Sequence, residues 1–163
     1  MTEPSESITL ELFADYFQFY LGDEKNGSSL EDSWTDEAVN RLLATAKCVI
    51  GVGTVRNMIV PVKINFYNSE PEVKIINLEK VNQINECDLE ILSGMIVVAG
   101  CTDYFPEAKR IKVENGIYRV RIYYGNLEVL SENGLEGEDF YELHLWRTNN
   151  FSPLKIIKQR VSY

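Results

Sequence analysis

Alternation of apolar and polar side chains is the feature that most restricts how this chain can fold. In residues 117–124, Tyr118, Val120 and Ile122 alternate with other side chains, two of them arginines, and residues 84–92 and 141–146 follow the same two-residue period. A period of two puts every second side chain on one face of an extended strand, so it predicts half-buried β-strands rather than helices. Turn-forming pairs, Ser93-Gly94 and Asn115-Gly116, adjoin these runs.

The same reasoning marks strands along most of the sequence. Further strand segments lie at residues 8–13, 14–21, 49–55, 58–67, 95–100 and 153–161. About nine short strands, roughly a dozen residues apart, predict a mainly β fold, an antiparallel β-sandwich. No linker or repeat divides the sequence, so we expect residues 1–163 to form a single domain.

One segment has a helical period instead. Thr35 is a suitable N-cap, and the acidic residues that follow it suit the first turn of a helix. Val39, Leu42, Leu43 and Ala46 then recur at the spacing of one apolar helix face. The sequence therefore predicts one α-helix over about residues 35–47.

The charge distribution indicates the kind of partner. The formal net charge is −9; residues 1–46 carry ten acids and two bases, 128–146 six acids and no base, and 147–163 four bases and no acid. Affinity for a phosphate backbone comes mainly from Lys and Arg. We therefore expect no direct nucleic acid or membrane partner, and favour a basic protein.

The sequence shows no recognisable targeting signal and no disulfide pattern, and this favours a reducing compartment. No apolar run approaches the ~20 residues of a membrane-spanning helix, and residues 1–7 lack the features of a signal peptide. Cys48, Cys87 and Cys101 fit neither a disulfide framework nor a zinc motif, so we expect buried free thiols and a cytoplasmic protein.

Candidate catalytic groups are few. His144 is the one histidine and shares its strand face with Glu142 and Trp146, where we expect it to be half-exposed and inert. The glycines of residues 51–53 are followed by a strand, so they favour close packing over a dinucleotide site. Glu86, Asp88 and Glu90 share a strand face, and we favour pairing with Arg119 or Arg121 over a metal or proton-sharing site. We expect no enzyme activity, cofactor or metal.

An acidic loop at residues 126–139 is the most unusual segment. Leucines and a valine are interspersed among its acids, which suggests that the loop is anchored. Its spacing does not match a calcium loop. A loop of this kind serves either solubility or contact with a basic partner, and sequence alone leaves both open.

A resemblance to a known family bears on this choice. Tyr16-Phe17-Gln18-Phe19, the polar loop after it, Trp34-Thr35-Asp36-Glu37-Ala38-Val39, and the Val/Ile strand near Arg56-Asn57 resemble the competence protein J family. This resemblance covers about residues 13–66. Members are small, non-enzymatic bacterial proteins that inhibit a DNA-entry nuclease; this chain is longer, with the acidic loop and the basic residues 147–163 as candidate additions.

The resemblance implies an inhibitor or immunity-type protein that blocks a nuclease surface. Rigid carboxylates can take the place of phosphates on such a surface. The candidate contact residues are Glu128, Glu132, Glu136, Glu138 and Asp139, then Asp23, Glu24, Glu31 and Asp32, with Trp34 as a possible anchor or a residue packed on the helix. A small-molecule-binding or structural accessory β-sandwich remains the alternative, and an enzyme would need its carboxylates to converge in a cleft.

Overall fold

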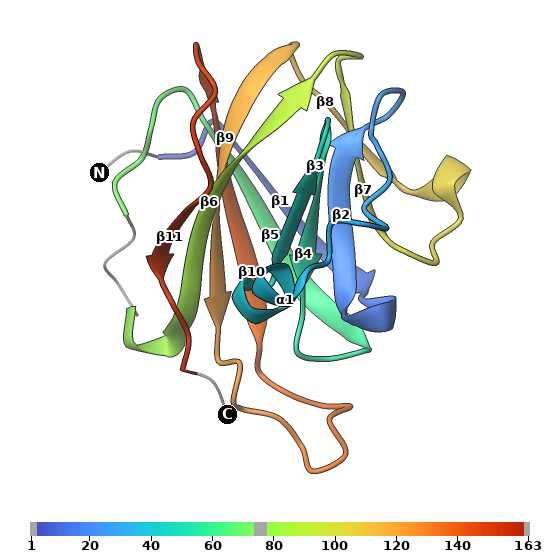
Figure 1. Cartoon of the computed structure of the whole chain (residues 1–163), viewed down its shortest axis with the longest axis vertical. Helices are drawn as coiled ribbons and strands as arrows, with labels where there is room; N and C mark the ends of the chain where they lie inside the picture. Colours follow the sequence, from blue (N-terminus) through green and yellow to red (C-terminus); the bar gives the residue numbers. More distant parts are fainter. Residues whose placement is uncertain (1–2, 74–77, 162–163) are drawn as a thin grey trace.

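Two β-sheets face each other across one core in the computed structural model, which describes residues 3–73 and 78–161 (Figure 1). In spatial order, one sheet holds β1 (Glu6–Phe13), β5 (Ile59–Tyr67), β10 (Phe140–Thr148), β9 (Gly116–Gly125), β6 (Val81–Ile91) and β11 (Lys155–Lys158). The other holds β3 (Leu43–Ala46), β4 (Val49–Gly53), β2 (Gln18–Asp23), β7 (Met95–Gly100) and β8 (Lys109–Lys112). The predicted β-sandwich is confirmed, with eleven strands in the described residues rather than nine.

The core forms where the alternating side chains of the two sheets meet. Ile122 and Leu143 from the six-stranded sheet and Ile50 and Ile96 from the five-stranded sheet are fully buried. Aromatic rings link the layers, since Phe19 of β2 packs edge-on against Tyr141 of β10 with centroids 6.0 Å apart. Burial of these apolar faces is the main stabilising contribution to the fold.

One strand pair departs from the predicted antiparallel arrangement. β10 pairs with β9 in an antiparallel register, whereas it pairs with β5 in a parallel register, with Tyr141 opposite Val62. Parallel neighbours need a long crossover. The chain between β5 and β10 supplies one, because it passes through both sheets before it returns.

The helix is shorter than the sequence predicted. α1 (Asp36–Arg41) begins at Thr35, whose Oγ1 accepts a hydrogen bond from the Ala38 N–H at 3.2 Å. It ends at Leu42, which adopts a left-handed conformation with φ 62°. Leu43 then enters β3 opposite Val52. The apolar residues Leu43 and Ala46 therefore belong to a strand and not to the helix, because pairing with β4 outweighs the local helical preference.

The structure tests the expectations for the glycines of residues 51–53 and for the three cysteines. A Cβ on Gly51 would come within 2.9 Å of the Trp34 ring, and this confirms that the glycine allows close packing. Cys48 and Cys87 are buried free thiols, as expected, and burial raises the pKa of Cys87 to about 12. Cys101 is exposed, contrary to expectation. No helix among the described residues has the length and apolar character to cross a membrane.

Asp23 joins the end of β2 to the turn between β6 and β7. Its carboxylate accepts hydrogen bonds from the backbone N–H groups of Leu92 at 2.5 Å, Ser93 at 2.8 Å and Lys25 at 2.9 Å. Burial raises its pKa, but hydrogen bonds from Ser93, Leu92 and Lys25 outweigh burial and hold the pKa well below its usual range. Asp23 is therefore a structural residue with its charge turned inward.

Asp23→Asn is expected to lower the free energy of unfolding by about 2–4 kcal/mol at pH 7, because an amide cannot accept all of these hydrogen bonds. Urea denaturation measures this loss, and the exposed Asp32→Asn is the control, with a change below about 0.5 kcal/mol. The depressed pKa of Asp23 stabilises the fold above the ordinary value of 3.8, and this stabilisation falls as the pH drops toward the folded pKa. Equal losses at pH 7 and pH 3 would contradict this role.

Candidate protein-interaction site

The acidic loop of residues 126–139 projects from one end of the sandwich between β9 and β10 (Figure 1). Its base is fixed to the start of β6, where the Leu127 N–H donates to Asn82 Oδ1 at 2.9 Å. Its two arms pair, since Leu130 bridges to Gly137 and the Glu138 N–H donates to the Val129 carbonyl at 2.9 Å. The loop is thus anchored, as its apolar residues predicted, and its two arms form a hairpin.

Four of its five acids point to solvent. Glu128, Glu132, Glu136 and Glu138 are exposed. Glu128 accepts a hydrogen bond from Asn82 Nδ2 at 2.8 Å, which orients its carboxylate. The carboxylates of the other three have no hydrogen bond or ion pair with any described residue. An anchored loop therefore presents several unneutralised carboxylates at one end of the molecule.

The fifth acid, Asp139, is not part of this exposed set. Its side chain is 0% exposed and accepts a hydrogen bond from Arg56 Nε at 2.6 Å and from the Tyr141 hydroxyl at 2.7 Å. Burial, and then the Asp139 carboxylate, raises the pKa of Tyr141 well above 10, so the phenol stays a donor. Arg56 also donates to the Leu135 carbonyl at 3.3 Å. Asp139 therefore holds the loop in place and cannot itself contact a partner.

The second group of candidates is divided in the same way. Asp23 is buried, and Glu24 accepts a hydrogen bond from Arg110 Nε at 2.5 Å. Glu31 and Asp32 are exposed just before α1. Trp34 is partly buried and donates from Nε1 to Gln18 Oε1 at 3.1 Å. Its ring lies on β4 at Gly51, so Trp34 packs on the sheet.

The sequence did not predict the exposed aromatic residues beside this end. Tyr16 is 69% exposed and Phe17 52%, although the alternation predicted one strand over residues 14–21. Both residues lie in the short 3₁₀ turn η1 (Asp15–Phe17) with φ near 60°. These left-handed residues reverse the chain before β2, and a two-residue period carries no signal of such a turn.

Two pockets connect these elements. The larger, about 570 Å³, is lined by Tyr16, Phe17, Gln18, Trp34, Val39, Leu42, Gly53, Thr54, Val55 and Arg160. The smaller, about 340 Å³, is lined by Val55, Asn82, Leu127, Glu128, Leu130 and Arg160. Both include Val55 and Arg160, so they are adjacent. We call their combined lining the aromatic trough.

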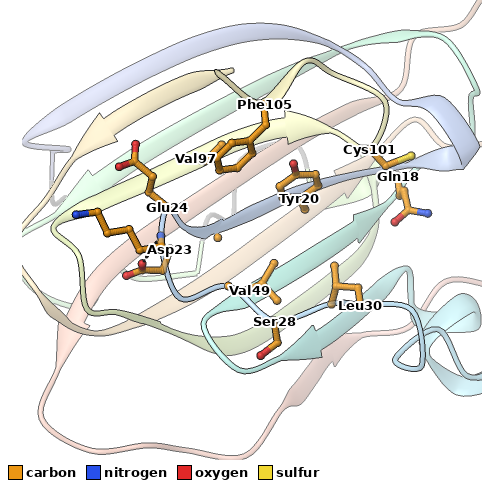
Figure 2. Close-up of a pocket in the computed structure, with 13 residues that line it drawn as sticks. Gln18, Tyr20, Asp23, Glu24, Ser28, Leu30, Val49, Val97, Cys101 and Phe105 are labelled. Carbon is orange, nitrogen blue, oxygen red and sulfur yellow. Dashed lines mark hydrogen bonds between the residues drawn. The ribbon is translucent and has the colours of Figure 1, made fainter. Parts of the chain in front are cut away.

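A different groove could hold a small ligand. It has a volume of about 350 Å³ and lies on the outer face of the five-stranded sheet, between the chain after β2 and the chain after β7 (Figure 2). Tyr20, Val49, Val97 and Phe105 contribute apolar surface. Its size is at the low end for ligand pockets.

Two of the three carboxylates of β6, Glu86 and Asp88, are paired across the sheet as expected, whereas Glu90 forms no ion pair with a described residue. Glu86 lies within 2.7 Å of Arg121 Nε and 3.3 Å of Arg119 Nε, and Asp88 lies 3.0 Å from Arg119 Nη1. Glu86 and Asp88 are therefore each neutralised by a guanidinium rather than directed at another acid in a cleft. No group of three or more potential metal ligands is formed among the described residues.

His144 is more buried than expected. It is 3% exposed, its Nε2 lies 2.7 Å from Glu142 Oε2, and the rings of Tyr67 and Tyr123 lie 5.1 and 4.9 Å away. The expectation of a half-exposed histidine is wrong because both faces of the six-stranded sheet are covered at this strand. His144 is inaccessible to a substrate in this conformation.

Fold and site together define a β-sandwich protein with an anchored acidic loop beside an aromatic trough. The Bacillus subtilis protein ComJ, an inhibitor of the DNA-degrading activity of NucA, has a similar structure: the TM-score is 0.62 at 19% sequence identity, and the match covers 91% of this chain and 99% of ComJ. The crocagin biosynthetic gene J protein is also similar, with a TM-score of 0.54, 18% identity, and coverage of 88% and 96%. No known family model matches the sequence, and no curated protein matches it by sequence.

These similarities concern the fold. The resemblance to the competence protein J family, predicted from residues 13–66, is confirmed as a structural resemblance and extends over most of the chain. At below 20% identity the fold can be retained while surface residues differ widely, so function has to be argued from this chain's own residues.

Arg56→Met is expected to lower the free energy of unfolding by about 3–5 kcal/mol, because it leaves the Asp139 carboxylate buried and unpaired. Hydrogen exchange in residues 126–139 should become faster. Adding Asp139→Asn should restore part of the stability by removing the buried charge. The control is Arg147→Met, whose partner Glu114 is exposed, with a cost below about 1 kcal/mol. Equal effects of the two arginine substitutions in urea denaturation would contradict the anchoring role.

Proposed function

We propose that this chain is a non-enzymatic, single-domain cytoplasmic protein that inhibits a nuclease by covering the surface that binds DNA. The observation that carries the proposal is the set of exposed glutamates on an anchored loop, together with the structural similarity to an inhibitor of NucA. The partner expected from this charge is a basic protein.

The physical basis is competition for a surface that attracts polyphosphate. A nuclease must present positive groups to DNA, and fixed carboxylates can pair with the same groups. The hairpin fixes the backbone that carries these carboxylates before binding, so little backbone entropy is lost on association. Attraction between the two surfaces accelerates encounter and weakens as salt screens it.

The direct test is inhibition of DNA degradation. NucA and each nuclease encoded by the host of this protein are incubated with plasmid DNA and increasing amounts of the purified chain. The proposal predicts stoichiometric inhibition of at least one of them. Full activity of every nuclease at a tenfold molar excess of the chain would refute it.

The quadruple variant Glu128→Gln/Glu132→Gln/Glu136→Gln/Glu138→Gln should slow association with the inhibited nuclease on the order of tenfold at low salt, because it removes the steering charges. Its association rate should also depend less on salt, as stopped-flow fluorescence can measure.

The matched control replaces the exposed acids Glu3, Glu6, Glu70 and Glu72 by Gln. It changes the net charge equally but at the opposite end of the sandwich, since Glu6 pairs with Phe66 at the end of β5, whereas the acidic loop adjoins its start. Similar slowing by both variants would show that the net charge of the protein, and not the acidic loop, determines the association rate.

A further inference from the structure

Tyr16 and Phe17 are held in a strained conformation that displays their rings. Each has a positive φ, which costs roughly 1 kcal/mol or more for a residue with a side chain. Surrounding bonds impose this conformation: the Tyr16 N–H donates to Asn57 Oδ1 at 2.8 Å, and the Phe17 carbonyl accepts from the Thr54 N–H at 2.9 Å. The β4–β5 turn therefore fixes two adjacent aromatic rings at the surface.

These rings border an apolar surface that continues toward the acidic loop. Val39 on α1 is 54% exposed, and Leu135 and Val129 in the loop are 47% and 39% exposed. The aromatic trough connects these regions through Val55. Exposed aromatic and aliphatic side chains around a hollow are typical of the centre of a protein interface.

Acidic side chains lie on elements that line the two pockets of the aromatic trough. Glu128 lines the smaller pocket, and Asp36 and Glu37 lie in the first turn of α1. Among the residues that the structure describes, the one base that lines either pocket is Arg160, whose guanidinium donates to the Asn40 carbonyl at 3.1 Å and so caps α1. The surroundings thus favour an occupant that carries positive charge around an apolar group.

We propose that the aromatic trough is the central contact of the inhibitory interface and receives an apolar side chain of the nuclease that is flanked by Lys or Arg. This inference rests on the proposed function and adds the residues that hold the complex together. Tyr16 and Phe17 act as the anchors, because large aromatic side chains in a central, desolvated position contribute most of the affinity of an interface. The glutamates of the acidic loop act mainly on the rate of encounter.

The test compares Tyr16→Asn/Phe17→Asn with a matched control, Tyr104→Asn/Phe151→Asn. Asn tolerates the left-handed conformation, so the fold should be retained, and the thermal midpoint confirms this. Tyr104 is 69% and Phe151 63% exposed, neither lines the trough, and Phe151 follows the far end of β10.

With the nuclease inhibited in the assay above, the trough variant should bind about 30-fold more weakly, through faster dissociation and with unchanged salt dependence. The control should bind like the wild type. Wild-type affinity of the trough variant, with inhibition intact, would overturn the inference and leave the proposed function standing.

If the wild-type chain inhibits none of the nucleases, the proposed function fails, and peptide probes test the trough alone. One fluorescent peptide carries a tryptophan between pairs of lysines, and the other carries serine in its place. The inference predicts that the tryptophan peptide binds at least fivefold more tightly, and that the trough variant abolishes this preference. Equal binding of both peptides to the wild type would overturn it.

Discussion

The buried ion pair between Arg56 and Asp139 is the contact on which the arrangement of the site depends. Arg56 lies in the turn that connects β4 of one sheet to β5 of the other, and Asp139 immediately precedes β10. Tyr141 extends the connection, since its hydroxyl donates to Asp139 and accepts from the Val55 N–H at 3.0 Å. One network thus fixes a turn between the sheets, the end of the acidic loop and the first residues of β10.

The same turn also supports the aromatic residues. Thr54 and Asn57 hold Phe17 and Tyr16, whereas Arg56 holds Asp139, so neighbouring residues of one short segment fix both components of the proposed interface. The backbone that carries the apolar anchors and the steering charges is therefore ordered before a partner arrives, which reduces the entropy lost on binding. Strain at Tyr16 and Phe17 is tolerated because the hydrogen bonds of this turn over-determine their conformation.

The sequence predicted the features that depend on the spacing of apolar residues along a short segment. It missed the features that depend on contacts between residues far apart in the chain. Alternation placed Cys87 and Leu89 on one strand face and Glu86 on the other, where pairing with Arg119 or Arg121 was expected, and the structure buries the first two and pairs Glu86 with both arginines. It could not distinguish Asp139 from the exposed acids beside it, because burial of that carboxylate depends on an arginine 83 positions away. Apolar spacing alone could not end α1 at Leu42 either, since strand pairing with β4 determines where the helix stops.

The most direct test of the account is hydrogen–deuterium exchange of the chain with and without the nuclease that it inhibits. We expect slower exchange on binding in residues 126–139 and 14–18, and unchanged exchange in residues 149–154 at the other end of the sandwich. Protection confined to that far end, or to the outer face of the five-stranded sheet, would contradict the account. Either result would place the interface away from the turn that Arg56 and Asp139 stabilise.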